Sequence, residues 1–136
     1  MREVCLLALV LLLLIEEGAM GLVYVRGVVK WAGRAREVDF LVDSGATYTV
    51  LKKEVWSFLG LEPKRWVELV LADGSIARRQ LSEAVIELPG YGEYHSPVLL
   101  GEEEDENLLG TVTLEIFGLM LDPFKRVLRP LRALLK

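Results

Sequence analysis

Two residue types that build many functional sites are almost missing from this sequence. It contains one cysteine, Cys5, and one histidine, His95. One cysteine cannot form a disulfide within the chain. Neither a zinc site nor a Cys/His nucleophile can be assembled from these two residues. We therefore expect no metal site in a monomer.

A strong excess of one charge is also absent. The chain has 16 basic and 20 acidic side chains, for a net charge of −4. This balance gives no reason to expect nucleic acid as a partner. Amides are scarce as well, since Asn107 and Gln80 are the only ones. Few amides together with plentiful Glu, Lys and Arg are typical of thermophile proteins.

What the sequence does contain suits one globular domain. The chain has 136 residues, of which 52% are apolar and 26% charged. These values predict a single core rather than a disordered chain. We place the domain at residues 20–136, after a separate N-terminal segment at residues 1–19.

That N-terminal segment carries an apolar run, CLLALVLLLLI, at residues 5–15. The run is too short to cross a bilayer comfortably as a helix, and its length fits a signal-peptide core better. No small-x-small cleavage site follows it, because Glu16 and Glu17 come next. Two alternatives remain, a membrane anchor and a true translation start at Met20. We expect a cytoplasmic protein, or a membrane-anchored one if residues 1–19 are retained as an anchor.

From residue 21 on, the sequence reads mainly as β-strands. β-branched and aromatic residues dominate residues 21–30 and 37–42, which predicts a hairpin that leads into Asp43. A second hairpin is indicated at residues 66–71 and 76–86. Its tip contains Asp-Gly, a strong hairpin signal, and consists of Ala72, Asp73, Gly74 and Ser75.

Further strands are indicated at residues 85–88 and 97–100, and an acidic loop, GEEEDEN, follows. Short helices are predicted at residues 52–59, ending at Gly60, and at residues 111–117. With about six or seven strands, this pattern predicts an all-β, barrel-like domain with one or two short helices.

Asp43 raises the question of function, because it lies between the apolar run FLV and Ser44-Gly45. An isolated buried carboxylate is costly, so the acid must be hydrogen-bonded, paired or catalytic. Two carboxylates that share one proton can hydrolyse a peptide, because one is the base that activates water. Gly45 permits a tight turn, and the Ser44 hydroxyl can hydrogen-bond within it. The plainer interpretation is an Asx-type turn at a strand end.

Asp43 stands in the only Asp-Ser/Thr-Gly of the chain. A second carboxylate must therefore come from another copy. A twofold axis would bring both copies of Asp43 together. The sequence thus predicts a homodimer with one shared site.

These features resemble the retroviral-type, or retropepsin-like, single-domain aspartyl proteases and their cellular and prokaryotic relatives. The resemblance covers roughly residues 20–128. It rests on Asp43-Ser44-Gly45-Ala46, on the hairpin tip about thirty residues later, and on Leu108-Leu109-Gly110 before a short helix. The tip is less glycine-rich than in the viral enzymes, and Arg78 and Arg79 follow it.

The resemblance implies a small closed β-barrel that is completed as a homodimer, and an aspartic endopeptidase that needs no cofactor. Asp43 would be the catalytic acid and base, supported by the loop residues Ser44, Gly45, Ala46 and Thr47. The hairpin tip, residues 72–75, would close over a peptide or protein substrate. Leu108, Leu109 and Gly110 would pass behind the catalytic loop. The alternative is a non-catalytic dimeric binding or assembly module of the same fold.

Overall fold

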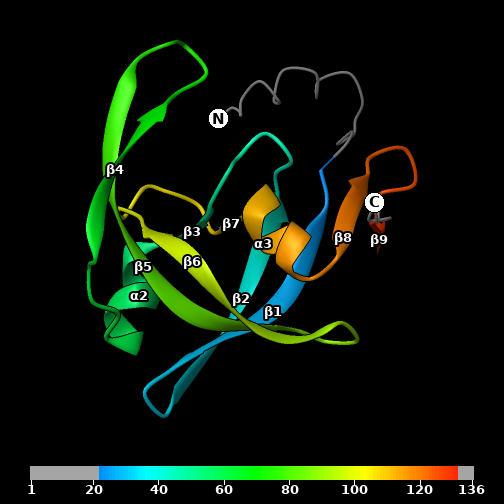
Figure 1. The fold of residues 1–136 in the computed structure, drawn as a ribbon, viewed down its shortest axis with the longest axis horizontal. Coiled ribbons are helices and arrows are strands. Elements are labelled where there is room, and N and C mark those ends of the chain that lie inside the picture. Colours follow the sequence, from blue (N-terminus) through cyan, green and yellow to red (C-terminus); the bar gives the residue numbers. More distant parts are fainter. Residues whose placement is uncertain (1–21, 132–136) are drawn as a thin grey trace, which may run out of the picture.

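The computed structural model describes residues 22–131, and the N-terminal segment at residues 1–19 lies outside them. The described chain is mostly β-structure with two short helices (Figure 1). In chain order the elements are β1 (Tyr24–Trp31), β2 (Arg34–Val42), β3 (Thr49–Leu51), α2 (Lys53–Leu59), β4 (Arg65–Val70), β5 (Ile76–Leu88), β6 (Gly92–Leu100), β7 (Leu108–Leu109), α3 (Thr111–Ile116), β8 (Leu119–Asp122) and β9 (Val127–Pro130).

Six strands close into a ring, which confirms the all-β barrel predicted from the sequence. Seven strands form one sheet in the order β1-β2-β7-β3-β6-β5-β4, and β1 also pairs with β5. That extra pairing joins the two sides of the sheet and leaves β4 outside the ring. β8 and β9 form a separate antiparallel pair.

The core fills the ring because apolar residues alternate along the strands. On β2, Val38, Phe40 and Val42 are buried, whereas Asp39 between them is exposed. This period of two places one face of a strand in the interior. Other fully buried large side chains come from β3, α2, β5, β6 and β7: Leu51, Leu59, Ile86, Leu88, Leu99 and Leu109.

The two predicted hairpins and both helices are present with small shifts at their ends. β1 and β2 meet at Ala32 and Gly33, which have φ angles of 50° and 83°. α2 ends at Gly60, whose φ of 75° is the left-handed conformation that suits glycine after a helix.

The structure differs from the sequence-based prediction in several strands. β6 begins at Gly92 rather than at residue 97. Residues 76–86 and 85–88, read as two strands, form the single long β5. β3 was not predicted, because three residues are too few to show an alternating pattern. The β8–β9 pair was missed because β9 has only four residues and ends in Pro130, a residue type that argues against a strand.

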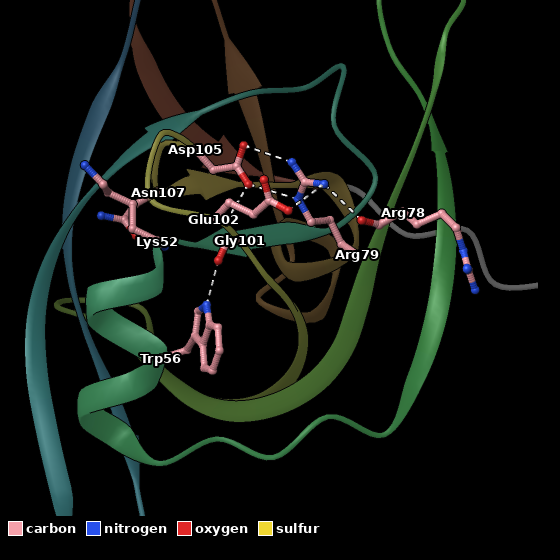
Figure 2. A network of polar contacts seen from close by, with 8 residues as sticks. All are labelled: Lys52, Trp56, Arg78, Arg79, Gly101, Glu102, Asp105 and Asn107. Atoms are coloured by element: carbon pink, nitrogen blue, oxygen red, sulfur yellow. Dashed lines mark hydrogen bonds and ion pairs between the residues drawn. The ribbon is translucent and has the colours of Figure 1, made fainter.

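The two segments tied to function by sequence lie at one end of the barrel. Figure 1 shows the β4–β5 hairpin in green, projecting beyond the ring, and the loop after β2 in teal at the same end. Figure 2, from a closer viewpoint, shows both rising in the same direction. Within residues 22–131, no helix is long and apolar enough to cross a membrane.

Candidate active site

Asp43 lies one residue past the end of β2, in a turn fixed by its own carboxylate. The Gly45 N–H donates to Asp43 Oδ1 at 2.9 Å, and the Ala46 N–H donates to the Asp43 carbonyl at 3.1 Å. Asp43 is partly buried, and the next two residues, Ser44 and Gly45, are exposed. The carboxylate is therefore oriented locally, and its surroundings remain open to another molecule. The Asx-type turn and a catalytic role are compatible in this geometry.

β7, which contains Leu108 and Leu109, is hydrogen-bonded to the start of the Asp43 turn. The Asp43 N–H donates to the Leu109 carbonyl at 3.0 Å, and the Leu41 N–H donates to the Asn107 carbonyl at 2.9 Å. β7 runs parallel to β2 and antiparallel to β3. It thus lies between the strand that enters the turn and the strand that leaves it.

Gly110 is needed because the backbone of the turn touches it. A Cβ atom at Gly110 would lie 2.5 Å from the carbonyl carbon of Tyr48 and 2.9 Å from the Thr47 oxygen. Beyond Gly110, the Thr111 and Val112 N–H groups donate to the carbonyls of Ala46 and Thr47. The start of α3 is thereby hydrogen-bonded directly to the loop that carries Asp43.

A chain of buried hydroxyls supports this contact, and sequence reasoning missed it. Thr49 on β3 lies 2.6 Å from Thr113 on α3, and Thr113 lies 2.8 Å from Ser96 on β6, each measured between side-chain oxygens. All three residues are almost completely buried. Thr49 and Ser96 lie outside the strands predicted from the sequence, so no sequence pattern indicated that their side chains point inward.

The tip of the β4–β5 hairpin is exposed and held by contacts within itself. Asp73 Oδ1 accepts hydrogen bonds from the Ser75 hydroxyl at 2.6 Å and the Ser75 N–H at 2.9 Å. These bonds, the hydroxyl first, lower the pKa of Asp73 below its ordinary value. The Leu71 N–H donates to the Ser75 carbonyl, and Gly74 has a φ of 86°. The Asp73 side chain therefore stabilises the turn.

Asp43 lines neither of two surface hollows that lie among residues 22–131. One, of about 680 Å³, lies beside the β1–β2 turn and includes Trp31 and His95. The other, of about 490 Å³, lies between the base of the β4–β5 hairpin and the acidic loop and includes Trp56 and Trp66. In the described part of the chain, no three His, Cys, Asp or Glu side chains are grouped to hold a metal ion.

A family model described as aspartyl protease matches residues 27–113. This match spans Asp43, the β4–β5 hairpin and β7, and covers more than half of the chain. The chain belongs to the aspartyl protease family, and its barrel is of the retropepsin-like type. No curated protein was found to match its sequence.

Proposed function

We propose that this protein is an aspartic endopeptidase whose active site is shared by two copies of the chain. The observation that carries the proposal is the single Asp-Ser-Gly turn, held by β7 and exposed at Ser44 and Gly45. One chain supplies one such carboxylate, and the chemistry of the family requires two. A twofold axis beside Asp43 supplies the second.

The reaction follows from the charge on such a pair. Two carboxylates about 3 Å apart cannot both be ionised, so one retains a proton. The ionised Asp43 removes a proton from water while the water oxygen bonds to the scissile carbonyl carbon. The protonated Asp43 of the second copy donates to the carbonyl oxygen. The first Asp43 then gives the proton it took from water to the amide nitrogen. As the carbon–nitrogen bond breaks, one hydroxyl of the tetrahedral diol returns its proton to the second Asp43, which restores the starting pair.

The β4–β5 hairpin would supply the upper wall of the substrate site. Its tip, residues 70–76, is exposed, and Val70, Leu71 and Ile76 present apolar side chains there. An extended peptide can pair with strand edges through main-chain hydrogen bonds. We infer that each copy lowers one hairpin over the peptide. The reaction consumes water and needs no cofactor.

The direct test is cleavage of a peptide library by the full-length protein and by Asp43→Asn. We expect the substitution to lower kcat/KM by about a thousandfold or more, because it removes the base. Asp39→Asn is the matched control, since Asp39 lies on β2, the strand that leads to Asp43, is exposed and pairs with Arg26. The control should cleave like the wild type. Cleavage retained by Asp43→Asn would refute the proposal.

A second readout separates an enzyme from a non-catalytic module of the same fold. A statine-type peptide mimics the tetrahedral transition state and binds such a dyad more tightly than substrate. It should raise the melting temperature of the wild type and not that of Asp43→Asn. A folded wild-type protein that neither cleaves peptides nor binds the inhibitor would favour the binding or assembly module.

A further inference from the structure

The β4–β5 hairpin leaves the barrel at a defined residue. β5 pairs with β6 from Leu88 as far as Gln80, whose partner is Leu100. Beyond Gln80, β5 pairs with β4 alone, and β4 forms the free edge of the sheet. Arg79 is the first residue past this point. It therefore lies where the hairpin would pivot against the barrel.

Arg79 forms a bidentate ion pair with Asp105 in the acidic loop, residues 101–107. Its Nε lies 3.0 Å from Asp105 Oδ2, and a terminal guanidinium nitrogen lies 3.3 Å from Asp105 Oδ1 (Figure 2). The Arg79 side chain is 19% exposed and that of Asp105 is 25% exposed. Partial burial and two parallel hydrogen bonds make such a pair stronger and more directional than a surface ion pair.

Asp105 is itself held in place by the loop. Its Oδ2 also accepts the Glu102 N–H at 2.7 Å, and its own N–H donates to the Glu102 carbonyl at 3.2 Å. Glu102 adds a weaker contact with Arg79 at 3.7 Å. The guanidinium is therefore bound to a closed loop rather than to a freely moving side chain.

The same loop continues into the structure that carries Asp43. Two residues after Asp105, the Asn107 side chain accepts the Lys52 N–H at 2.8 Å, and its carbonyl accepts the Leu41 N–H. The loop then enters β7, next to the Asp43 turn. The acidic loop thus links Arg79 at the hairpin base to Lys52 and to Leu41 of β2. Figure 2 shows Arg79, Asp105, Asn107 and Lys52 along this path.

Two other polar contacts of the hairpin lie within it. The Arg78 guanidinium stacks over the Trp66 ring at 4.6 Å, and Asp73 bonds to Ser75. Neither contact reaches the barrel. The Arg79–Asp105 pair is thus the cross-link suited to fix the angle of the hairpin.

We propose that Arg79 is a positioning residue, whose ion pair with Asp105 sets the angle at which the β4–β5 hairpin stands over the Asp43 site. This inference rests on the proposed peptidase function. The role is to hold substrate, not to transfer protons. Loss of the pair should therefore weaken binding of substrate and transition state equally, which raises KM and leaves kcat unchanged.

The test compares steady-state kinetics of Arg79→Ala, Arg79→Lys and Asp105→Asn in the full chain. We expect KM to rise about tenfold in Arg79→Ala and Asp105→Asn, with kcat within about twofold of wild type, because one charge-assisted contact is lost. Arg79→Lys keeps the positive charge but cannot make the bidentate contact, so its KM should lie between those of wild type and Arg79→Ala. Arg26→Ala removes an exposed arginine–aspartate pair on β1 and β2 and is the matched control. If kcat of Arg79→Ala falls as much as its kcat/KM, the inference is overturned. It is also overturned if the KM of Arg79→Ala equals that of Arg26→Ala.

Hydrogen exchange separates this inference from the proposed function. If wild-type protein cleaves nothing, the exchange rates of amides at residues 65–78 still report hairpin motion. Arg79→Ala should raise them about tenfold relative to those of β6, and Arg26→Ala should not. Equal rates in wild type and Arg79→Ala would overturn the positioning role. If Arg79→Ala does not fold, Asp105→Asn, which conserves volume, decides by the same measurements.

Discussion

Thr49 and Thr113 are 64 residues apart in sequence, and their hydroxyl oxygens lie 2.6 Å apart in the interior. Thr49 also accepts the Gly110 N–H at 3.0 Å, and Ser96 contacts both Thr113 and the Pro97 carbonyl. A head-to-tail order of protons, from Gly110 through the three hydroxyls to the carbonyl, leaves every donor satisfied. This chain ties β3, α3 and β6 to the end of β7, and so supports the loop of Asp43.

Removal of the central hydroxyl should be costly. Thr113→Val keeps the shape of the side chain but leaves Thr49 and Ser96 with unsatisfied buried groups. We expect a loss of about 1–3 kcal/mol in the free energy of unfolding. Thr113→Ser keeps the hydroxyl and should lose only about 1 kcal/mol, for one methyl group. Urea unfolding at a fixed protein concentration measures both. A larger loss for serine than for valine would contradict the hydroxyl chain.

Gly110→Ala tests the close contact between β7 and the Asp43 loop. The added Cβ would lie 2.5 Å from the Tyr48 carbonyl carbon, which is backbone and cannot move aside. We expect a loss of more than about 3 kcal/mol, or failure to fold. Expression yield and thermal unfolding provide the measurement. Unchanged stability would mean that the loop does not rest on Gly110.

Gly45→Ala should separate activity from stability. A Cβ at Gly45 meets only Asp43 Oδ1, at 3.3 Å, so the carboxylate must shift while the fold is spared. We expect unfolding free energy within about 1 kcal/mol of wild type, and kcat lower by about tenfold or more because the base is misplaced. Paired denaturation and kinetic assays check this. Full activity in a stable variant would argue against Asp43 as the catalytic group.

Asp122 should make the β8–β9 pair sensitive to acid. Its carboxylate accepts the N–H groups of Lys125 and Phe124 and pairs with Arg129, and these contacts, with Lys125 first, lower its pKa below the ordinary 3.8. Because the pKa of Asp122 is lower in the folded state, its contacts stabilise the fold at pH values above the pKa of the unfolded state. This stabilisation is lost as the pH falls through the pKa of the folded state. Asp122→Asn should therefore flatten the pH dependence below 3.8. The measurement is the free energy of unfolding of wild type and Asp122→Asn as a function of pH. If the two free energies fall in parallel below pH 3.8, Asp122 does not cause the acid sensitivity.

The sequence predicted the barrel and the Asp43 turn because both leave local signals. Alternating apolar residues mark β1, β2 and β5, and Asp-Gly marks the tip of the β4–β5 hairpin. The Asp43-Ser44-Gly45 motif needs only neighbouring residues to be seen. Such features are set by short stretches of chain, so a linear reading reaches them.

Contacts between distant residues could not be predicted in the same way. Arg79 and Asp105 come together only because β5 and the loop after β6 are neighbours in the folded sheet. Likewise, β7 has two residues, and its place between β2 and β3 is set by the closure of the ring. The hydroxyl chain depends on three elements at once. These features come from tertiary packing, which a pattern of single residues does not encode.

Mixing of wild-type and Asp43→Asn chains tests the central claim, a catalytic site shared between two copies, most directly. The two proteins are mixed at a constant total chain concentration and an increasing fraction of Asp43→Asn chains. Cleavage is measured after the chains have equilibrated between dimers. If both copies of Asp43 are required, activity should follow the square of the wild-type fraction, or about one quarter at equal parts. Activity that falls linearly, to about one half at equal parts, would mean that each chain works alone and would contradict the shared dyad.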